Sequence, residues 1–240
     1  MRRFLLIALV LAVGLGAPAA GEIVFQPGFT PADLADLSEA LGDALVLPNL
    51  GPAEPTGVSG FEILAAWGGP RVDSSSHWWD YGVKGSRTLG LLGGGRIIAR
   101  KGLPRGFDVG GQVGTALGNR FWGAEVRWAL LEGGMVEPAL AVRASFTRME
   151  QGSGLRVDVS EAQLVVSKGF TLLTPYAAAG YRRVESRAFF GDPLPLTWET
   201  KADRWTGAAG VRVSFLPVRV VAEVRRAFRT SVFVGVGVGL

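Results

Sequence analysis

One short stretch of the sequence combines residue types that could carry out acyl transfer. In SSSHWWDYG, His77 is the only histidine of the chain, Ser76 precedes it and Asp80 follows three residues later. A serine, a histidine and an aspartate can together activate a hydroxyl nucleophile, and the two adjacent tryptophans could hold a lipid chain. The stretch is equally typical of an aromatic anchor at a membrane interface, and the sequence identifies no oxyanion donor. Catalysis by His77, Ser76 and Asp80 is therefore the alternative hypothesis, and the main expectation is a protein without enzymatic activity.

Charged residues form a second pattern, in which they alternate with apolar residues. From Trp122 to Leu130 aromatic and aliphatic side chains occupy every second position, and Glu125 and Arg127 fall between them. A period of two is typical of a β-strand with one apolar and one polar face. If the strands close into a barrel with the apolar face outward, the polar face lines the interior. The residues expected to line it are Glu125, Arg127, Arg143, Arg183, Arg204, Arg212, Arg219, Glu223 and Arg225.

The strands that would position these residues can be read from the same alternation. Segments of roughly ten residues, separated by glycine-rich or proline-containing turns, follow one another from Gly60 to the end of the chain. Ten strands are expected; merging or splitting the glycine-rich segments would give eight or twelve. The expected strands lie near 61–67, 88–100, 105–117, 122–130, 140–146, 155–167, 173–186, 204–215, 218–225 and 230–240.

The connections and the start of the chain indicate where such a barrel would lie. Residues 1–20 contain two arginines, an apolar run and a small-residue cleavage site, which together predict a secretory signal peptide. Compact turns alternate with junctions that include two long loops, Gly68–Arg87 and Arg187–Asp203. Short turns on one side, longer loops on the other and an even strand number are typical of an outer-membrane barrel with both termini in the periplasm. The predicted fold is an all-β, transmembrane, antiparallel up-and-down barrel over residues 59–240.

An acidic segment, residues 21–58, precedes the barrel and contains a predicted amphipathic helix over residues 30–46. Thr30 is a suitable N-cap, Pro31 suits the first helical position, and leucines recur at helical spacing. The acidic face of this helix could plug the basic lumen from the periplasmic side. Alternatively, its leucine face could lie on the membrane interface or on a periplasmic partner. The plug candidates are Asp33, Asp36, Glu39 and Asp43.

Composition disfavours other kinds of site. The chain has no cysteine, which excludes disulfides, thiolate zinc sites and a catalytic thiol. With one histidine and scattered carboxylates no metal site is expected, and without a phosphate-loop or dinucleotide signature no cofactor is expected. The pI of about 9.8 could indicate nucleic-acid binding. Export and arginines that alternate with valines favour the barrel lumen instead, so no nucleic-acid partner is expected.

Several segments resemble known proteins. LVLPNLGPAEPTGVSGFEI, KGLPRGFDVG, PALAVRASF and VSKGFTLLTPYAAAGYRR are similar to segments of small, mostly uncharacterised proteobacterial outer-membrane barrel proteins of the porin-like, OmpA/OmpX-like kind. The resemblance implies contact with outer-membrane lipid and lipopolysaccharide and assembly by the barrel-assembly machinery, but no activity or catalytic residues. Leu240 departs from the aromatic residue that usually ends such barrels. The expected function is a structural protein or a narrow pore for small polar or anionic solutes; the alternative is a lipid-modifying enzyme.

Overall fold

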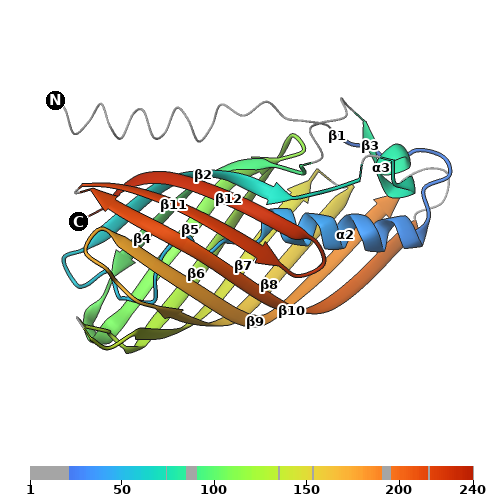
Figure 1. Cartoon of the computed structure of the whole chain (residues 1–240). Coiled ribbons are helices and arrows are strands. Elements are labelled where there is room, and N and C mark those ends of the chain that lie inside the picture. Colours follow the sequence, from blue (N-terminus) through green and yellow to red (C-terminus); the bar gives the residue numbers. More distant parts are fainter. Residues whose placement is uncertain are drawn as a thin grey trace.

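A closed barrel of ten antiparallel strands dominates the computed structural model, which describes residues 22–73, 75–84, 91–134, 136–152, 154–190, 196–215 and 217–239 (Figure 1). The predicted signal peptide, residues 1–20, and Leu240 lie outside the described residues. The strands of the barrel are β2 (Phe61–Pro70), β4 (Gly94–Gly102), β5 (Phe107–Ala116), β6 (Asn119–Leu131), β7 (Ala139–Gln151), β8 (Leu155–Ser167), β9 (Leu173–Phe190), β10 (Leu196–Phe215), β11 (Val218–Arg226) and β12 (Thr230–Gly239). The predicted fold class and strand number are confirmed.

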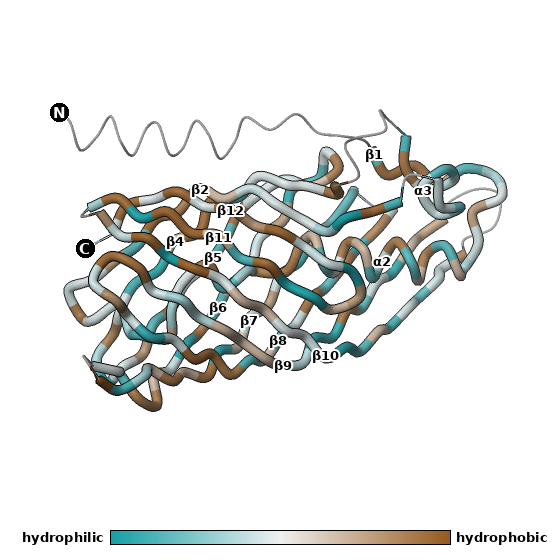
Figure 2. The backbone as a smooth tube through the Cα atoms, viewed as in Figure 1, coloured by the Kyte–Doolittle hydropathy of each residue, from teal (hydrophilic) through white to brown (hydrophobic). Residues whose placement is uncertain are grey.

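Each strand pairs with its neighbours in the sequence, and the last strand closes the barrel by pairing with the first. In the closing pair Val236 lies opposite Ala65 and Gly237 opposite Leu64. The alternating hydropathy that identified the strands is visible along the chain in Figure 2. Among the described residues, no helix has the length and apolar character needed to cross a membrane.

The two ends of the barrel differ. One end, called here the turn end, carries the connections 103–106, 132–138, 168–172 and 216–217. The opposite end, called the loop end, carries the connections 71–93, 117–118, 152–154, 191–195 and 227–229. The connection after β2 contains a short helix, α3 (His77–Gly82), and a short strand, β3 (Val83–Lys84).

The second predicted long loop, Arg187–Asp203, is largely strand, so this prediction was wrong. β9 and β10 continue beyond their neighbours at the loop end and stay paired to Phe190 and Leu196. Charged residues of opposite sign face each other across this pair, which stabilises an extended hairpin even in water. The cross-strand ion pairs are Arg183–Asp203, Lys201–Glu185 and Arg187–Glu199.

The predicted N-terminal helix is present as α2 (Pro31–Leu45) and lies against the inner wall of the barrel. Thr30 caps it through a capping box with Asp33. Its leucine face packs on inward-facing apolar residues of the strands, including Leu64 and Phe233. The helix approaches β9 so closely that a Cβ at Gly42 would overlap the side chain of Val184.

The described chain enters the barrel at the loop end. Its first residues form β1 (Glu22–Ile23), which pairs with β3, and the Gln151 amide donates to the carbonyl of Ile23 at 2.6 Å. An aromatic cluster of Phe25, Phe29, Phe190 and Trp198 ties this segment to the β9–β10 hairpin. The last described residue, Gly239, lies at the turn end opposite Glu62. The described residues therefore begin at the loop end and end at the turn end, because the chain threads the lumen before β2 begins.

Candidate functional site

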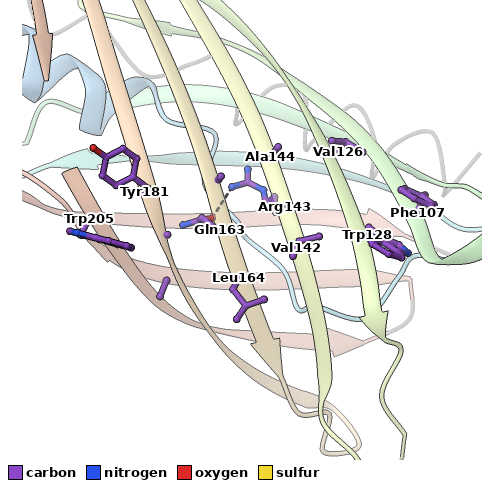
Figure 3. Close-up of a pocket in the computed structure, with 13 residues that line it drawn as sticks. Phe107, Val126, Trp128, Val142, Arg143, Ala144, Gln163, Leu164, Tyr181 and Trp205 are labelled. Carbon is purple, nitrogen blue, oxygen red and sulfur yellow. Dashed lines mark hydrogen bonds between the residues drawn. The ribbon is translucent and has the colours of Figure 1, made fainter. Parts of the chain in front are cut away.

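The outer face of the barrel carries a broad apolar band. Between the aromatic pair Phe107–Trp128 near the turn end and the pair Tyr181–Trp205 nearer the loop end, the outward positions are apolar. A shallow groove of about 590 Å³ lies between these pairs over small alanines, while Arg143 and Gln163 point to the other side of the wall (Figure 3). The first outward charges beyond the band toward the loop end are Arg120, Arg148, Asp158, Arg183, Asp203 and Arg226. Near the turn end, Lys101 on β4 is an exposed outward charge beside Val109.

The band has the height of a membrane core. On β10 it extends from Trp205 to Phe215, which are ten residues apart. At about 3.3 Å per residue and a tilt of about 40°, this length spans roughly 25 Å, close to the apolar height of outer-membrane barrels.

The interior begins, at the loop end, with ion pairs between α2 and the wall. Arg182, with 1% of its side chain exposed, pairs with Asp43 and lies 3.4 Å from Glu39. Arg204 donates to Glu39 at 2.6 Å, and the backbone N–H of Arg229 donates to Asp43 at 2.7 Å. Two carboxylates of one helix face are thus held by two wall arginines and by the backbone of the connection 227–229. Removing water from a charge costs several kcal/mol unless a partner compensates, so these contacts fix the helix in register.

The C-terminal end of α2 is held by a buried arginine. Arg96 donates to the carbonyls of Ala44 at 2.5 Å and Val46 at 2.7 Å, and its guanidinium lies against the rings of Phe121 and Phe233. The last carbonyls of a helix have no partner within it and carry a partial negative charge. A cation placed there therefore satisfies both the hydrogen bonds and the helix dipole.

After α2 the chain continues through the lumen as an extended segment, residues 46–56, called here the strap. Pro48, Pro52 and Pro55 remove three backbone donors and keep the strap out of helix and sheet. Its carbonyls still need donors, since an unpaired buried carbonyl is costly. Arginines of the wall supply them. The contacts are Arg100 to Asn49 at 2.5 Å, Arg127 to Pro52 at 2.6 Å and Arg143 to Leu47 at 2.7 Å.

Buried carboxylates balance these arginines and also hold the strap. Glu125 accepts from Arg100 at 2.6 Å and from Arg143 at 2.5 Å. Glu223 accepts from Tyr176 at 2.8 Å and from the backbone N–H groups of Asn49 and Leu50 at 3.2 and 2.8 Å. The network is continuous from wall to strap, so the strap cannot leave without exposing several buried charges.

The structure places most of the predicted lining residues inside the barrel. Arg183 is the exception: it lies outside, half exposed, and pairs with Asp203, whereas its neighbour Arg182 points inward. The prediction for Arg183 was wrong because successive residues of a strand point to opposite faces, and the sequence does not indicate which of the two adjacent arginines of β9 points inward. Arg204 has the inward parity of β10 but is half exposed at the loop end, where it meets Glu39. Those found inside are Glu125, Arg127, Arg143, Arg212, Arg219, Glu223 and Arg225.

Sequence reasoning also missed several interior arginines. Arg96, Arg100 and Arg182 are buried at 5% exposure or less and contact α2 or the strap. Arg96 and Arg100 are four residues apart and so share one strand face, which was a usable signal. Of the plug candidates, Glu39 and Asp43 meet wall arginines, Asp33 meets His77, and Asp36 is exposed.

The candidate catalytic residues are not assembled for acyl transfer. His77 Nδ1 lies 2.8 Å from Asp33 on α2, and its ring stacks on Tyr81 at 4.4 Å. Ser76 instead donates to the carbonyl of Asp73 at 2.7 Å, and Asp80 meets Gln26 through its backbone carbonyl. The pKa of Asp33 lies below its ordinary value: burial alone would raise it, but hydrogen bonds from Thr30 and His77 outweigh burial. His77 thus joins α3 to the first turn of α2.

Comparison with known proteins gives fold similarities of low sequence identity. No protein-family model matches the sequence, and no curated protein matches it. The N-terminal β-barrel domain of Pseudomonas aeruginosa OprF is similar with a TM-score of 0.41 and 11% identity, over 77% of this chain and 99% of that one. The KdgM porin is similar with a TM-score of 0.38 and 10% identity, over 74% and 98%. The attachment invasion locus protein Ail of Yersinia pestis is similar with a TM-score of 0.38 and 9% identity, over 78% and 99%.

Proposed function

We propose that the chain is an outer-membrane barrel whose lumen is closed by its own N-terminal segment, and that it is a narrow pore for small polar or anionic solutes when this segment is displaced. The observation that supports closure is the continuous network between the wall and the segment 30–56. Both carboxylates of α2 that face the wall meet arginines, and the strap carbonyls are bonded to arginines. The apolar outer band supports the membrane location.

The lining supports a preference for anions. Displacing α2 removes Glu39 and Asp43 from the lumen and frees Arg182, Arg204 and Arg96. An arginine-lined passage lowers the energy of an anion within it and raises that of a cation. The opened barrel should therefore conduct small anions better than cations of similar size.

Deletion of residues 22–50 tests closure and pore formation together. Single-channel recording in planar bilayers should show rare, small openings for the full chain and a persistent, larger conductance for the deletion variant, with the reversal potential in a salt gradient indicating anion preference. Resistance of the folded barrel to denaturing detergent must be shown for both proteins. A folded deletion variant without conductance would contradict the pore, and an unchanged conductance would contradict closure by α2.

We further propose that the turn end faces the periplasm and the loop end the exterior. The chain has no native cysteine, so single cysteines report accessibility without background. Glu22, at the loop end, and Val136, at the turn end and 88% exposed, are suitable positions. In intact cells an impermeant maleimide should label Glu22→Cys and not Val136→Cys, and both after lysis. The reverse pattern would invert the orientation.

A further inference from the structure

A small cavity at the turn end of the lumen is built almost entirely from charged side chains and the strap. It encloses about 140 Å³. Its walls come from strands that are distant in sequence, and the strap covers it from the lumen axis. The charged residues that line it are Arg100, Arg127, Arg212, Arg219, Glu54 and Glu62.

The carboxylates of this cavity do not neutralise its arginines. Glu62 lies between Arg100 at 2.9 Å and Arg219 at 2.8 Å, so its charge is already shared. Glu54 is 3.7 Å from Arg212, too far for a hydrogen bond. Arg212 therefore has only this weak ion pair, and Arg127 has no ion pair with a carboxylate among the described residues. With four arginines and two glutamates, the lining carries an excess of positive charge.

Arg127 and Arg212 also have unused donors. Arg127 is 4% exposed and donates only to Pro52 and to the side chain of Asn49, both neutral acceptors. Its buried Nε, like that of Arg212, has no hydrogen-bond partner among the described residues. A buried guanidinium without a carboxylate is costly. An anion in the cavity would supply both the missing charge and the missing acceptors.

We infer that this cavity binds a small oxyanion, of the size and charge of inorganic phosphate. Among the arginines of the cavity that have an ion pair, Arg212 has the longest one, at 3.7 Å from Glu54, and its Nε has no hydrogen-bond partner among the described residues. A bound anion would supply Arg212 with a charged hydrogen-bond acceptor. Arg127 supplies buried charge, and Glu54 acts against binding. The inference deepens the proposed function and rests on it for a role in permeation. Binding itself is measured on the closed barrel, so the two can fail separately.

The test is titration of the purified full chain with inorganic phosphate, followed calorimetrically, with chloride at matched ionic strength as the reference because screening changes all surface electrostatics. Saturable binding of phosphate over chloride is expected. Arg212→Gln should weaken it about tenfold or more, as expected for loss of one charged hydrogen bond. Arg183→Gln is the matched control, since Arg183 lies on the outer face and is half exposed; it should bind phosphate as the native chain does.

Glu54→Gln separates binding from general damage, because removing the opposing charge should tighten phosphate binding while Arg212→Gln weakens it. A damaged fold cannot produce opposite shifts. No saturable signal over chloride, or equal affinities for Arg212→Gln and Arg183→Gln, would overturn the inference. If Arg212→Gln does not fold, unchanged affinity in Glu54→Gln overturns it alone.

Discussion

Replacing Asp43 by asparagine should loosen α2 from the wall and make the barrel open. Asp43 is buried, pairs with Arg182 and accepts the backbone N–H of Arg229 at 2.7 Å. The substitution removes one negative charge and leaves Arg182 with Glu39 alone, at 3.4 Å. Since Arg204 already holds Glu39 at 2.6 Å, this second partner compensates only in part.

The size of the effect follows from this arrangement. Breaking a buried ion pair by removing one partner costs about 3–5 kcal/mol. The remaining contact with Glu39 places Asp43→Asn near the lower end, at about 3 kcal/mol. At about 1.4 kcal/mol for each factor of ten, the ratio of displaced to docked helix should rise roughly 100-fold. Openings that are rare in the native chain should then be frequent.

The matched control is Asp36→Asn, which makes the same charge change on the same helix. Asp36 is exposed, and the described residues provide it with no hydrogen bond or ion pair. Single-channel recording at one voltage should show the increase for Asp43→Asn and not for Asp36→Asn, with both barrels folded. Equal opening frequencies in the two variants, whether high or low, would refute the argument that the buried pair holds the helix.

Three further outcomes are expected. Gly42→Ala should lower thermal stability by about 1–3 kcal/mol through overlap with Val184, although alanine favours helices, whereas Gly207→Ala, which meets open space, should be neutral. Val234→Arg, on the lipid-facing side, should reduce refolding into vesicles by about 2–4 kcal/mol, and Val58→Arg, exposed at the turn end, should not; similar losses would contradict the assigned faces. Asp33→Asn should lower the free energy of unfolding at neutral pH. Because the pKa of Asp33 is depressed in the folded state, the loss of stability relative to the native chain should be constant above the ordinary value of 3.8 and should shrink as the pH falls through the lowered pKa. A loss that persists in acid would exclude the carboxylate as its cause.

The barrel could be predicted from the sequence because its signal is local. Within the apolar outer band, apolar residues occupy every second position on one strand after another, so the period of two recurs along the chain and each repeat supports the others. The same holds for α2, since Thr30, Pro31 and the leucine spacing are all within one segment. In the loop-end extension of β9 and β10, polar and apolar residues do not alternate cleanly. The sequence there is typical of a loop, but the structure shows paired strands.

The path of the N-terminal segment could not be predicted in the same way. The sequence indicates a basic interior and an acidic helix. This charge complementarity predicts that the helix contacts the interior, but it does not determine from which end of the barrel the helix enters. That is decided by contacts between distant residues, such as Asp33 with His77 and Gln151 with Ile23, and no periodicity encodes them. The strap is similar: its prolines predict only irregular chain, while its position depends on arginines from separate strands.

The alternation of valine and glycine along β12 shows how wall and network depend on each other. Val232, Val234 and Val236 of this strand are exposed on the outer face, and the inward positions between and after them are Gly235, Gly237 and Gly239, which have no side chains of their own. In the structure neighbouring side chains cover these glycines: a Cβ at Gly237 would stand 2.6 Å from Leu64, and one at Gly239 would overlap the guanidinium of Arg219. Arg219 on β11 reaches across β12 to Glu62 on β2, at 2.8 Å, and it can do so because the inner face of β12 has only glycines, Gly237 and Gly239, at this end. The glycines of β12 therefore leave room for the ion pair between Arg219 and Glu62, which links β11 to β2 where the barrel closes.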